Sequence, residues 1–343
     1  MNIQPADTPS GIGCRIISNC FNASIVIDGM HARELAWLFG FARAPAFEWT
    51  SLRTRGEIII SLDAPDKPTA AETVDIDLED GHVITASNQP ARLQVEPHHS
   101  LRPTLFPRSL NLCLSQQFAR AGILPVHGAG LVLDGTGIML LGGKASGKST
   151  LVAAALATGA RVVSDDWLLF GLDRQGVPTM ERLRQFLMLR HGHATKSLID
   201  RHESLSFQPS TQRPKSTLAI SSNAPEFPPQ HLIDQLWILR RLNPRPATTQ
   251  TDQSNRGSAL TAFVTHSMPI LFGKRFGHEH KNLQALLAAF LPKATLLEVA
   301  TGLDMVTDTA ATLSRLMQLG PPRKLRTSTQ ETKSDPPESA DQR

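Results

Sequence analysis

Short apolar runs alternate with polar turns over residues 110–141, and their order predicts a helix followed by a hairpin. Leucines and a phenylalanine recur among polar residues over 110–121, which favours a helix. Residues 124–133 and 137–141 are apolar runs of strand length. Asp134-Gly135 between them is a strong signal for a tight β-hairpin turn.

A helix and a further strand follow this hairpin. Residues 149–157 are rich in alanine and leucine and are closed by Gly159, which suits a left-handed helix end. Residues 161–164 then form a short β-branched run that stops at Asp165. Strands alternating with a helix predict an α/β fold in which ligands collect at the carboxyl ends of the strands.

The N-terminal part has a different pattern of short strands. The segments that read as strands are 57–62, 74–78, 82–85 and 91–95. They predict a small α+β or mainly β domain over 1–105, in which no residues suggest chemistry. A second domain is expected over 106–320, and the residues 321–343 have almost no apolar side chains and read as a disordered tail.

The C-terminal half of the second domain gives fewer signals. Residues 235–239 read as a strand, and loops are expected over 207–229 and 243–257. Two helices are predicted near the end, over 282–290 and 305–319, the second with Asp304 as its cap.

Composition narrows the class of protein. Hydrophobic residues make up 41% of the 343 and charged residues 19%, as in globular proteins. No apolar run reaches membrane-span length and the N-terminal residues do not resemble a signal peptide, so we expect a cytoplasmic protein that does not act at a membrane. The net charge is +4, but basic residues are scattered, which argues against nucleic-acid binding. The three cysteines are odd in number and lack metal-like pairing with nearby histidines, so neither a disulfide framework nor a zinc site is predicted.

One glycine-rich segment carries the clearest chemistry. It matches the phosphate-binding loop pattern, in which two glycines let backbone N–H groups surround a phosphate, a lysine adds a fixed charge, and a serine hydroxyl binds Mg²⁺. The candidate nucleotide-binding residues are Gly142, Gly143, Lys144, Ala145, Ser146, Gly147, Lys148, Ser149 and Thr150. The loop stands between a predicted strand and a predicted helix, as this chemistry requires.

Two aspartates follow the loop after one helix and one strand. Together with His127, Asp165 and Asp166 are expected to meet the loop at the same edge of the sheet. In the order Val126-His127-Gly128, hairpin, phosphate loop and Val163-Ser164-Asp165-Asp166, the chain resembles the catalytic domain of the HPr kinase/phosphorylase family of P-loop serine kinases.

The resemblance implies a fold and a set of roles. The fold would be a P-loop mixed-sheet kinase domain, using ATP and Mg²⁺ to phosphorylate a serine of a protein or peptide, and a homo-oligomer is implied as well. Lys148 would hold the nucleotide phosphates, Ser149 and Asp166 would bind Mg²⁺, and Asp165 would act as general base with His127 beside it. Adjacent carboxylates can take these two roles because Mg²⁺ neutralises the charge of Asp166 while Asp165 faces the serine hydroxyl.

The resemblance covers residues 126–166 and has limits. Family members carry a glutamate directly after the loop serine, where this chain has Thr150, and their glycine-rich signature after the aspartates has no counterpart here. The chain therefore resembles diverged HPr kinase-related proteins, and neither HPr as substrate nor the phosphorylase reaction is implied. A small-molecule kinase, a nucleotide-dependent ATPase switch and a degenerate binding module stay open as alternatives.

Overall fold

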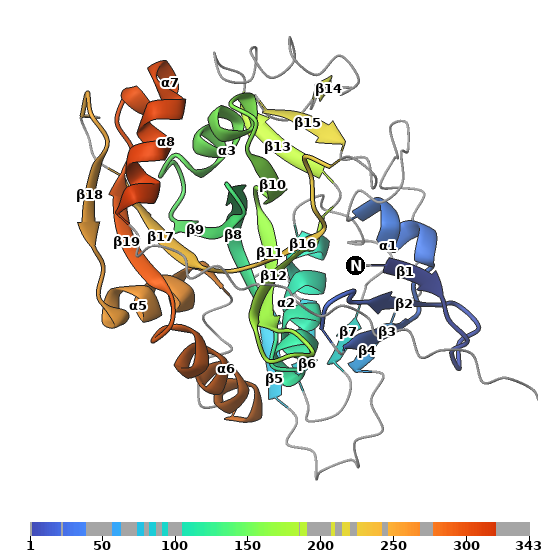
Figure 1. Ribbon diagram of the computed structural model, residues 1–343. Helices are drawn as coiled ribbons and strands as arrows, with labels where there is room; N and C mark the ends of the chain where they lie inside the picture. Colours follow the sequence, from blue (N-terminus) through green and yellow to red (C-terminus); the bar gives the residue numbers. More distant parts are fainter. Residues whose placement is uncertain are drawn as a thin grey trace, which may run out of the picture.

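A computed structural model describes residues 2–21, 23–38, 57–62, 74–78, 82–86, 91–94, 105–184, 186–190, 207–209, 215–219, 225–241, 246–267 and 277–319. The tail predicted over 321–343 lies outside these residues. Within them the chain is mixed α/β, with a large mixed sheet, a separate antiparallel sheet and a third sheet of three short strands (Figure 1).

The N-terminal sheet is antiparallel in all its described pairings and has the order β1-β2-β3-β4-β7-β6-β5. Its strands are β1 (Asn2–Pro5), β2 (Gly13–Ile17), β3 (Ser24–Asp28), β4 (Glu57–Leu62), β5 (Val74–Leu78), β6 (His82–Ala86) and β7 (Ala91–Gln94). The four strands predicted from the sequence are thus confirmed, and β1 to β3 with the helix α1 (Ala32–Leu38) extend them.

The large sheet has nine described strands in the order β16-β12-β11-β8-β9-β17-β19-β18, with β10 paired to β8. The strands are β8 (Leu124–Leu133), β9 (Thr136–Gly142), β10 (Arg161–Ser164), β11 (Trp167–Leu172), β12 (Pro178–Arg182), β16 (Gln230–Leu232), β17 (Gln235–Arg240), β18 (Gln250–Gln253) and β19 (Thr295–Ala300). Of these, β9, β17 and β19 run parallel, while the other pairings are antiparallel.

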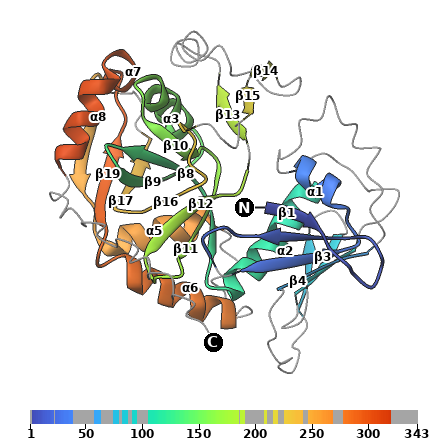
Figure 2. The ribbon, with the colours of Figure 1, turned by 45° about the vertical axis from the view of Figure 1, so that its right-hand side comes forward.

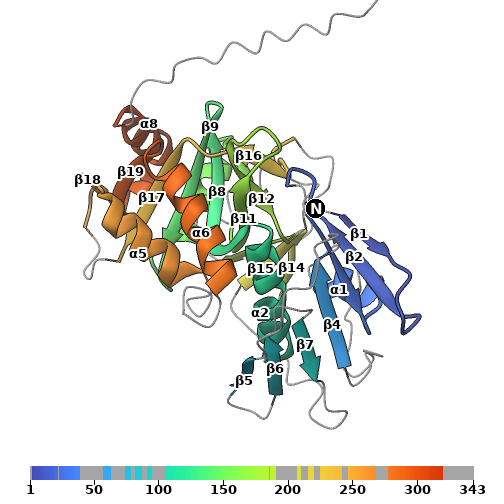
Figure 3. The ribbon, with the colours of Figure 1, turned by 90° about the horizontal axis from the view of Figure 1, so that it is seen from below.

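Helices cover both faces of this sheet because its inner strands are apolar on both sides. Along β9, Ile138 and Leu140 face a core shared with α3 (Lys148–Ala157), α7 (Asp304–Thr307) and α8 (Thr309–Gln318). Met139 and Leu141 point the other way, toward α5 (Arg256–His266) and α6 (Gly277–Phe290). Figure 1 shows these two groups of helices on opposite sides of the strands, and Figure 3, seen from below, shows α5 and α6 in front of them.

The predicted hairpin is present as β8 and β9. Its loop consists of Asp134 and Gly135, with φ angles of 48° and 75°. Positive φ at both central positions is the geometry that this dipeptide favours in a tight hairpin. The turn leads β9 directly toward the glycine-rich segment.

Helix α2 (Leu105–Arg120) connects the two large sheets. Leu110, Leu114 and Phe118 are buried in the core of the N-terminal sheet, while Ala119 belongs to the core under the nine-stranded sheet. Figure 2 shows α2 between the two sheets. Because α2 packs on both, the boundary at residue 105 stays a prediction.

Buried polar contacts also join the two sheets. The carboxylate of Glu181 on β12 accepts hydrogen bonds from Ser18 Oγ at 2.6 Å and from the backbone N–H of Asn19 at 3.0 Å. The thiol of Cys20 lies 3.3 Å from the same carboxylate, and burial, with the Glu181 charge, raises the pKa of that thiol above its usual range. Glu181 itself is fully buried.

Three predictions for the C-terminal half need correction. The segments 207–229 and 243–257, expected to be loops, contain strands at 207–209, 215–219 and 250–253, which form by pairing with other strands and not by local composition. The helix expected over 305–319 is two helices, α7 and α8, interrupted at Asp308, whose φ of −143° is not helical. Asp304 is not a cap: its carboxylate accepts hydrogen bonds from the N–H and hydroxyl of Thr249, so the side chain is directed away from its own helix start.

The remaining strands are β13 (Phe186–Arg190), β14 (Phe207–Pro209) and β15 (Lys215–Ala219), in the order β13-β15-β14. Leu187 of β13 is buried in the core that contains α3. The small sheet therefore packs beside the helix that follows the glycine-rich segment, as Figure 1 also shows.

Candidate functional site

The glycine-rich segment joins the end of β9 to the start of α3. Two of its residues adopt positive φ, Ala145 at 64° and Gly147 at 105°, and Gly147 is the N-cap of the helix. These turns wrap the backbone around the space in front of the helix N-terminus, where the first N–H groups lack partners within the helix and the helix dipole is positive. Gly143, Lys144 and Ala145 are exposed there. Such a turn suits an anion.

Lys148 is folded back over this segment. Its side chain is buried, and its ammonium group donates hydrogen bonds to the backbone carbonyls of Gly142 and, at 3.4 Å, Gly143. These contacts hold the positive charge over the loop instead of letting it extend into water. A fixed ammonium at this place complements a phosphate bound by the loop.

The residues of the segment fit a phosphate in two further respects. Ser146 Oγ is buried, and among the described residues it has no hydrogen-bond partner, so it is a polar atom for which a ligand oxygen would be a suitable partner. A Cβ at Gly142 would lie 2.6 Å from that hydroxyl and 2.8 Å from the carbonyl oxygen of Leu239. Glycine is therefore required at position 142 for the loop to close this tightly.

The two aspartates lie across β8 from the loop. Ser164 of β10 pairs with Gly130, and Trp167 of β11 pairs with His127, so β10 and β11 follow one edge of β8 with Asp165 and Asp166 in the bend between them. On the other edge Gly128 pairs with Leu141, one residue before the loop. With strands ~4.8 Å apart, the aspartates and the end of β9 are roughly 10 Å apart in backbone position.

His127 contacts Asp166. The distance from Nε2 to Oδ1 is 3.1 Å, and the ring also lies beside Trp167, with centroids 6.1 Å apart. The resemblance implied His127 beside Asp165, which stays a prediction, and the contact that the structure describes is with Asp166. Its physical reason is the bend at residues 165–166, which interrupts side-chain alternation and turns Asp166 toward β8.

The two carboxylates differ in burial. Asp165 is only 3% exposed, whereas the Asp166 side chain is 23% exposed and that of His127 44%. The second oxygen of Asp166 forms an ion pair with Arg184, a residue that the sequence analysis did not select. Asp166 is thus the more accessible carboxylate, and it contacts one basic group on each oxygen.

A second histidine lies near the loop and was also missed. His266 is the last residue of α5, which is anchored by Phe263 against Phe170 and Phe290 at centroid distances of 5.3 Å and 5.9 Å. Burial lowers the pKa of His266 to about 4, and the charges of Lys148 and His127 contribute to the shift. His266 is therefore a neutral imidazole in the electrostatic neighbourhood of the loop lysine.

The carboxyl end of β19 also reaches the loop. The hydroxyl of Thr301 lies 3.5 Å from the carbonyl oxygen of Ser146, and β19 ends one residue earlier. At the end of β17, Arg240 pairs with the buried carboxylate of Glu298. That ion pair links β17 to the neighbouring strand β19.

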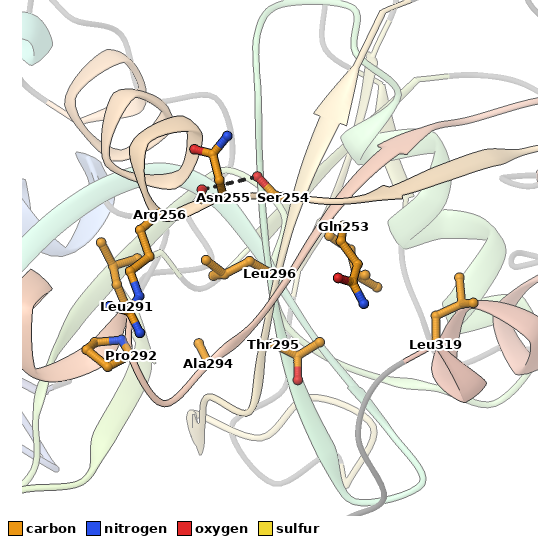
Figure 4. A pocket seen from close by; sticks show the side chains of 11 residues that line it. Gln253, Ser254, Asn255, Arg256, Leu291, Pro292, Ala294, Thr295, Leu296 and Leu319 are labelled. Carbon is orange, nitrogen blue, oxygen red and sulfur yellow. Dashed lines mark hydrogen bonds between the residues drawn. The ribbon is translucent and has the colours of Figure 1, made fainter.

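A separate hollow of about 350 Å³ lies beside the start of α5 (Figure 4). His266 is at the other end of this helix. The lining of the hollow includes Asn255 and Arg256 at the start of α5, and Leu291, Pro292 and Leu296. An eleven-residue helix is roughly 15 Å long, so this hollow is not part of the loop region. None of the residues selected from the sequence line it.

A sequence signal did exist for the helix that carries His266. Asn255 caps α5 through the N–H of Ser258, and Ala259, Ala262 and Phe263 follow at helical spacing, which predicts a helix ending near His266. No linear pattern indicates Arg184, because its place level with Asp166 follows from the register of the β11–β12 pairing.

No protein-family profile matches the chain, and no curated protein sequence matches it either. Among solved structures the chain is similar to the HPr(Ser) kinase/phosphatase from Coxiella burnetii, with 13% sequence identity and a TM-score of 0.29. The match covers 57% of this chain and 96% of that one. A TM-score this low carries no argument about a shared fold or activity.

In the part of the chain that the structure describes, no helix has the length and apolar character needed to cross a membrane.

Proposed function

We propose that this chain is an ATP- and Mg²⁺-dependent kinase that phosphorylates a serine hydroxyl of a protein or peptide, in a P-loop domain formed by the nine-stranded sheet and its helices. The observation that carries the proposal is the loop between β9 and α3, with Lys148 held over it and a pair of carboxylates across one strand. Phosphoryl transfer needs alignment and charge neutralisation more than covalent chemistry, and these groups supply both.

In this proposal the loop binds the nucleotide phosphates. Backbone N–H groups around Gly143 to Gly147 and the N-terminus of α3 face the phosphates, and the ammonium group of Lys148 neutralises their charge. Ser149 in the first turn of α3 and Asp166 would hold Mg²⁺, since hydroxyl and carboxylate oxygens are ligands that this ion prefers. Bound Mg²⁺ would neutralise charge on the phosphate oxygens.

The carboxylates orient and deprotonate the acceptor. Asp165 is assigned as the base that takes the serine proton, and its burial keeps the carboxylate away from bulk water. His127 lies on β8, the strand between β9 and β11, and it contacts Asp166. It therefore orients the carboxylate pair through Asp166. The exposed face of His127 and of the loop supports an acceptor that arrives from solvent, as a serine on a peptide would.

The test is transfer of the γ-phosphate of ATP to a library of serine-bearing peptides, with Asp165→Asn, Asp166→Asn and Lys148→Met beside the wild type. We expect serine phosphorylation by the wild type and a loss of at least about a hundredfold in each variant, as for removal of a base or a charged stabilising group. Peptides with alanine in place of serine are the control for the acceptor.

Other outcomes identify other functions. Transfer to metabolites but not peptides would indicate a small-molecule kinase. Steady ATP hydrolysis that no acceptor accelerates would indicate an ATPase switch. Transfer that survives both Asp165→Asn and Lys148→Met would reject the assignment of the site.

A further inference from the structure

The carboxylate of Asp166 is held from both sides by basic groups. Nε2 of His127 lies 3.1 Å from one oxygen, and the guanidinium group of Arg184 pairs with the other. The side chains of Asp166 and Arg184 are 23% and 17% exposed, so the ion pair is largely screened from water by protein. An ion pair in such surroundings is stronger than one on an open surface.

Strand pairing determines the place of Arg184. In the β11–β12 hairpin Leu168 pairs with Arg182, and the same register carried two residues further puts Arg184 level with Asp166. The N–H of Leu183 contacts the carbonyl oxygen of Trp167 at 3.4 Å, which continues the pairing past the end of β12. Arg184 is therefore held across from Asp166 by the sheet itself.

This arrangement conflicts with uptake of a lone metal ion. Asp166 is one of the two residues proposed to hold Mg²⁺, yet a guanidinium carries a permanent positive charge that repels a divalent cation at the same carboxylate. Lys148 adds a second fixed positive charge over the loop. The triphosphate of a nucleotide would supply the negative charge that offsets both.

We propose that Arg184 is a positioning residue of this site, which holds the Asp166 carboxylate toward His127 and opposes binding of Mg²⁺ until the ion arrives together with nucleotide phosphates. This inference rests on the proposed function, because it concerns the metal of that reaction. It assigns to Arg184 a role through Asp166, without contact to the reacting atoms.

The experiment measures Mn²⁺, as a paramagnetic substitute for Mg²⁺, binding to the nucleotide-free protein by electron paramagnetic resonance. Wild type is compared with Arg184→Met and Arg184→Gln, which remove the charge, and with Arg184→Lys, which keeps it. Arg174→Met is the matched control, since Arg174 is exposed on the turn of the same hairpin. Circular dichroism confirms that each protein is folded.

We expect Arg184→Met and Arg184→Gln to bind Mn²⁺ roughly three- to tenfold more tightly than wild type, the range of one partly screened charge interaction. Arg184→Lys and Arg174→Met should stay within about twofold of wild type, by the same estimate. Peptide phosphorylation should fall in Arg184→Met, because Asp166 loses its orientation.

Unchanged or weaker Mn²⁺ binding in both uncharged variants would overturn the inference, and so would an Arg184→Lys protein that behaves like Arg184→Met. These results do not depend on whether the proposed function is correct. If the wild type shows no kinase activity, the comparison of Mn²⁺ binding among the variants can still be interpreted. If the wild type is an active kinase and Mn²⁺ binding is unchanged in the variants, only the role of Arg184 is rejected.

Discussion

The side chains around the loop are positioned by the ends of strands and helices. Lys148 follows the left-handed Gly147 and opens α3, and His266 ends α5. Asp166 stands in the bend between β10 and β11, where its carboxylate reaches His127. Backbone geometry at these ends brings together basic and acidic groups that are far apart in the sequence, and it makes single substitutions informative.

Lys148→Met should weaken nucleotide binding by roughly ten- to a hundredfold, the range of one lost hydrogen bond to a charged group. Methionine keeps the apolar stem that is buried at this position but removes the ammonium group that contacts the loop carbonyls. Fluorescence titration with a labelled ATP analogue measures the change. Equal affinity in wild type and variant would show that Lys148 does not bind the phosphates.

The lowered pKa of His266 predicts that the stability of the fold depends on pH. Because its pKa in the folded protein, about 4, is below the ordinary value of 6.5, the unfolded chain binds a proton more readily between these two pH values. Stability should therefore fall as pH decreases from 6.5 to 4. In His266→Gln this contribution is absent, so the variant should lose less stability than wild type over that window.

Urea unfolding of wild type and His266→Gln at pH 7 and pH 5 measures the loss of stability in each protein. The difference between wild type and variant isolates His266 from the carboxylates, among them Asp28 and Asp304, whose pKa values are lowered by hydrogen bonds. Equal losses in the two proteins would show that His266 is not kept neutral by its surroundings.

At the scale of elements, predictions were accurate where local signals are strong. The hairpin with Asp134-Gly135 and the helix after the loop were both predicted. Each is determined by residues that are close together in the sequence, a turn dipeptide in the first case and a run of helix formers in the second. Strand β19 and helix α5 were missed, although both border the loop. Thr295–Ala300 is a short apolar run with an interior glutamate, and only pairing with β17 distinguishes it as a central strand.

The site was predicted in part for the same reason. The loop residues follow from a contiguous motif, whereas Arg184 and His266 reach the site through sheet register and helix packing that a linear pattern does not record. The pairing of His127 with Asp166 was missed because the bend at 165–166 breaks strand alternation.

Two adjacent glycines of the loop should tolerate alanine differently. At Gly142 an added Cβ would lie 2.8 Å from the carbonyl oxygen of Leu239, while at Gly143 it would meet nothing within 4 Å. Gly142→Ala should therefore lower the free energy of unfolding by about 1–3 kcal/mol, as overpacking does, and Gly143→Ala should change it by less than about 0.5 kcal/mol. Thermal and urea unfolding measure both. Equal stability of the two variants would contradict the tight closure of the loop.

At the scale of the whole molecule, the N-terminal sheet is joined to the nine-stranded sheet by α2 and by Glu181. The fully buried carboxylate of Glu181 accepts hydrogen bonds from Ser18 and Asn19 in the segment after β2. Such a contact couples the unfolding of one sheet to that of the other.

Glu181→Leu should destabilise the protein by about 3 kcal/mol or more, because it leaves buried donors without an acceptor. Ser18→Ala removes one donor and should cost only about 1 kcal/mol. Unfolding of wild type and variants followed by tryptophan fluorescence and circular dichroism gives both values. A loss in Glu181→Leu no larger than that in Ser18→Ala would show that the buried carboxylate does not join the two sheets.

The central claim is that the loop, the aspartate pair and His127 act together to move a phosphoryl group from ATP to a serine. It is tested most directly by incubating the protein with Mg²⁺, ATP carrying heavy oxygen in its γ-phosphate, and serine-bearing peptides, followed by mass spectrometry of the peptides and of free phosphate. We predict phosphoserine carrying the heavy oxygens of the γ-phosphate with the wild type, and none with Asp165→Asn. Heavy oxygen found only in free phosphate, or the same phosphoserine yield from Asp165→Asn, would contradict the claim.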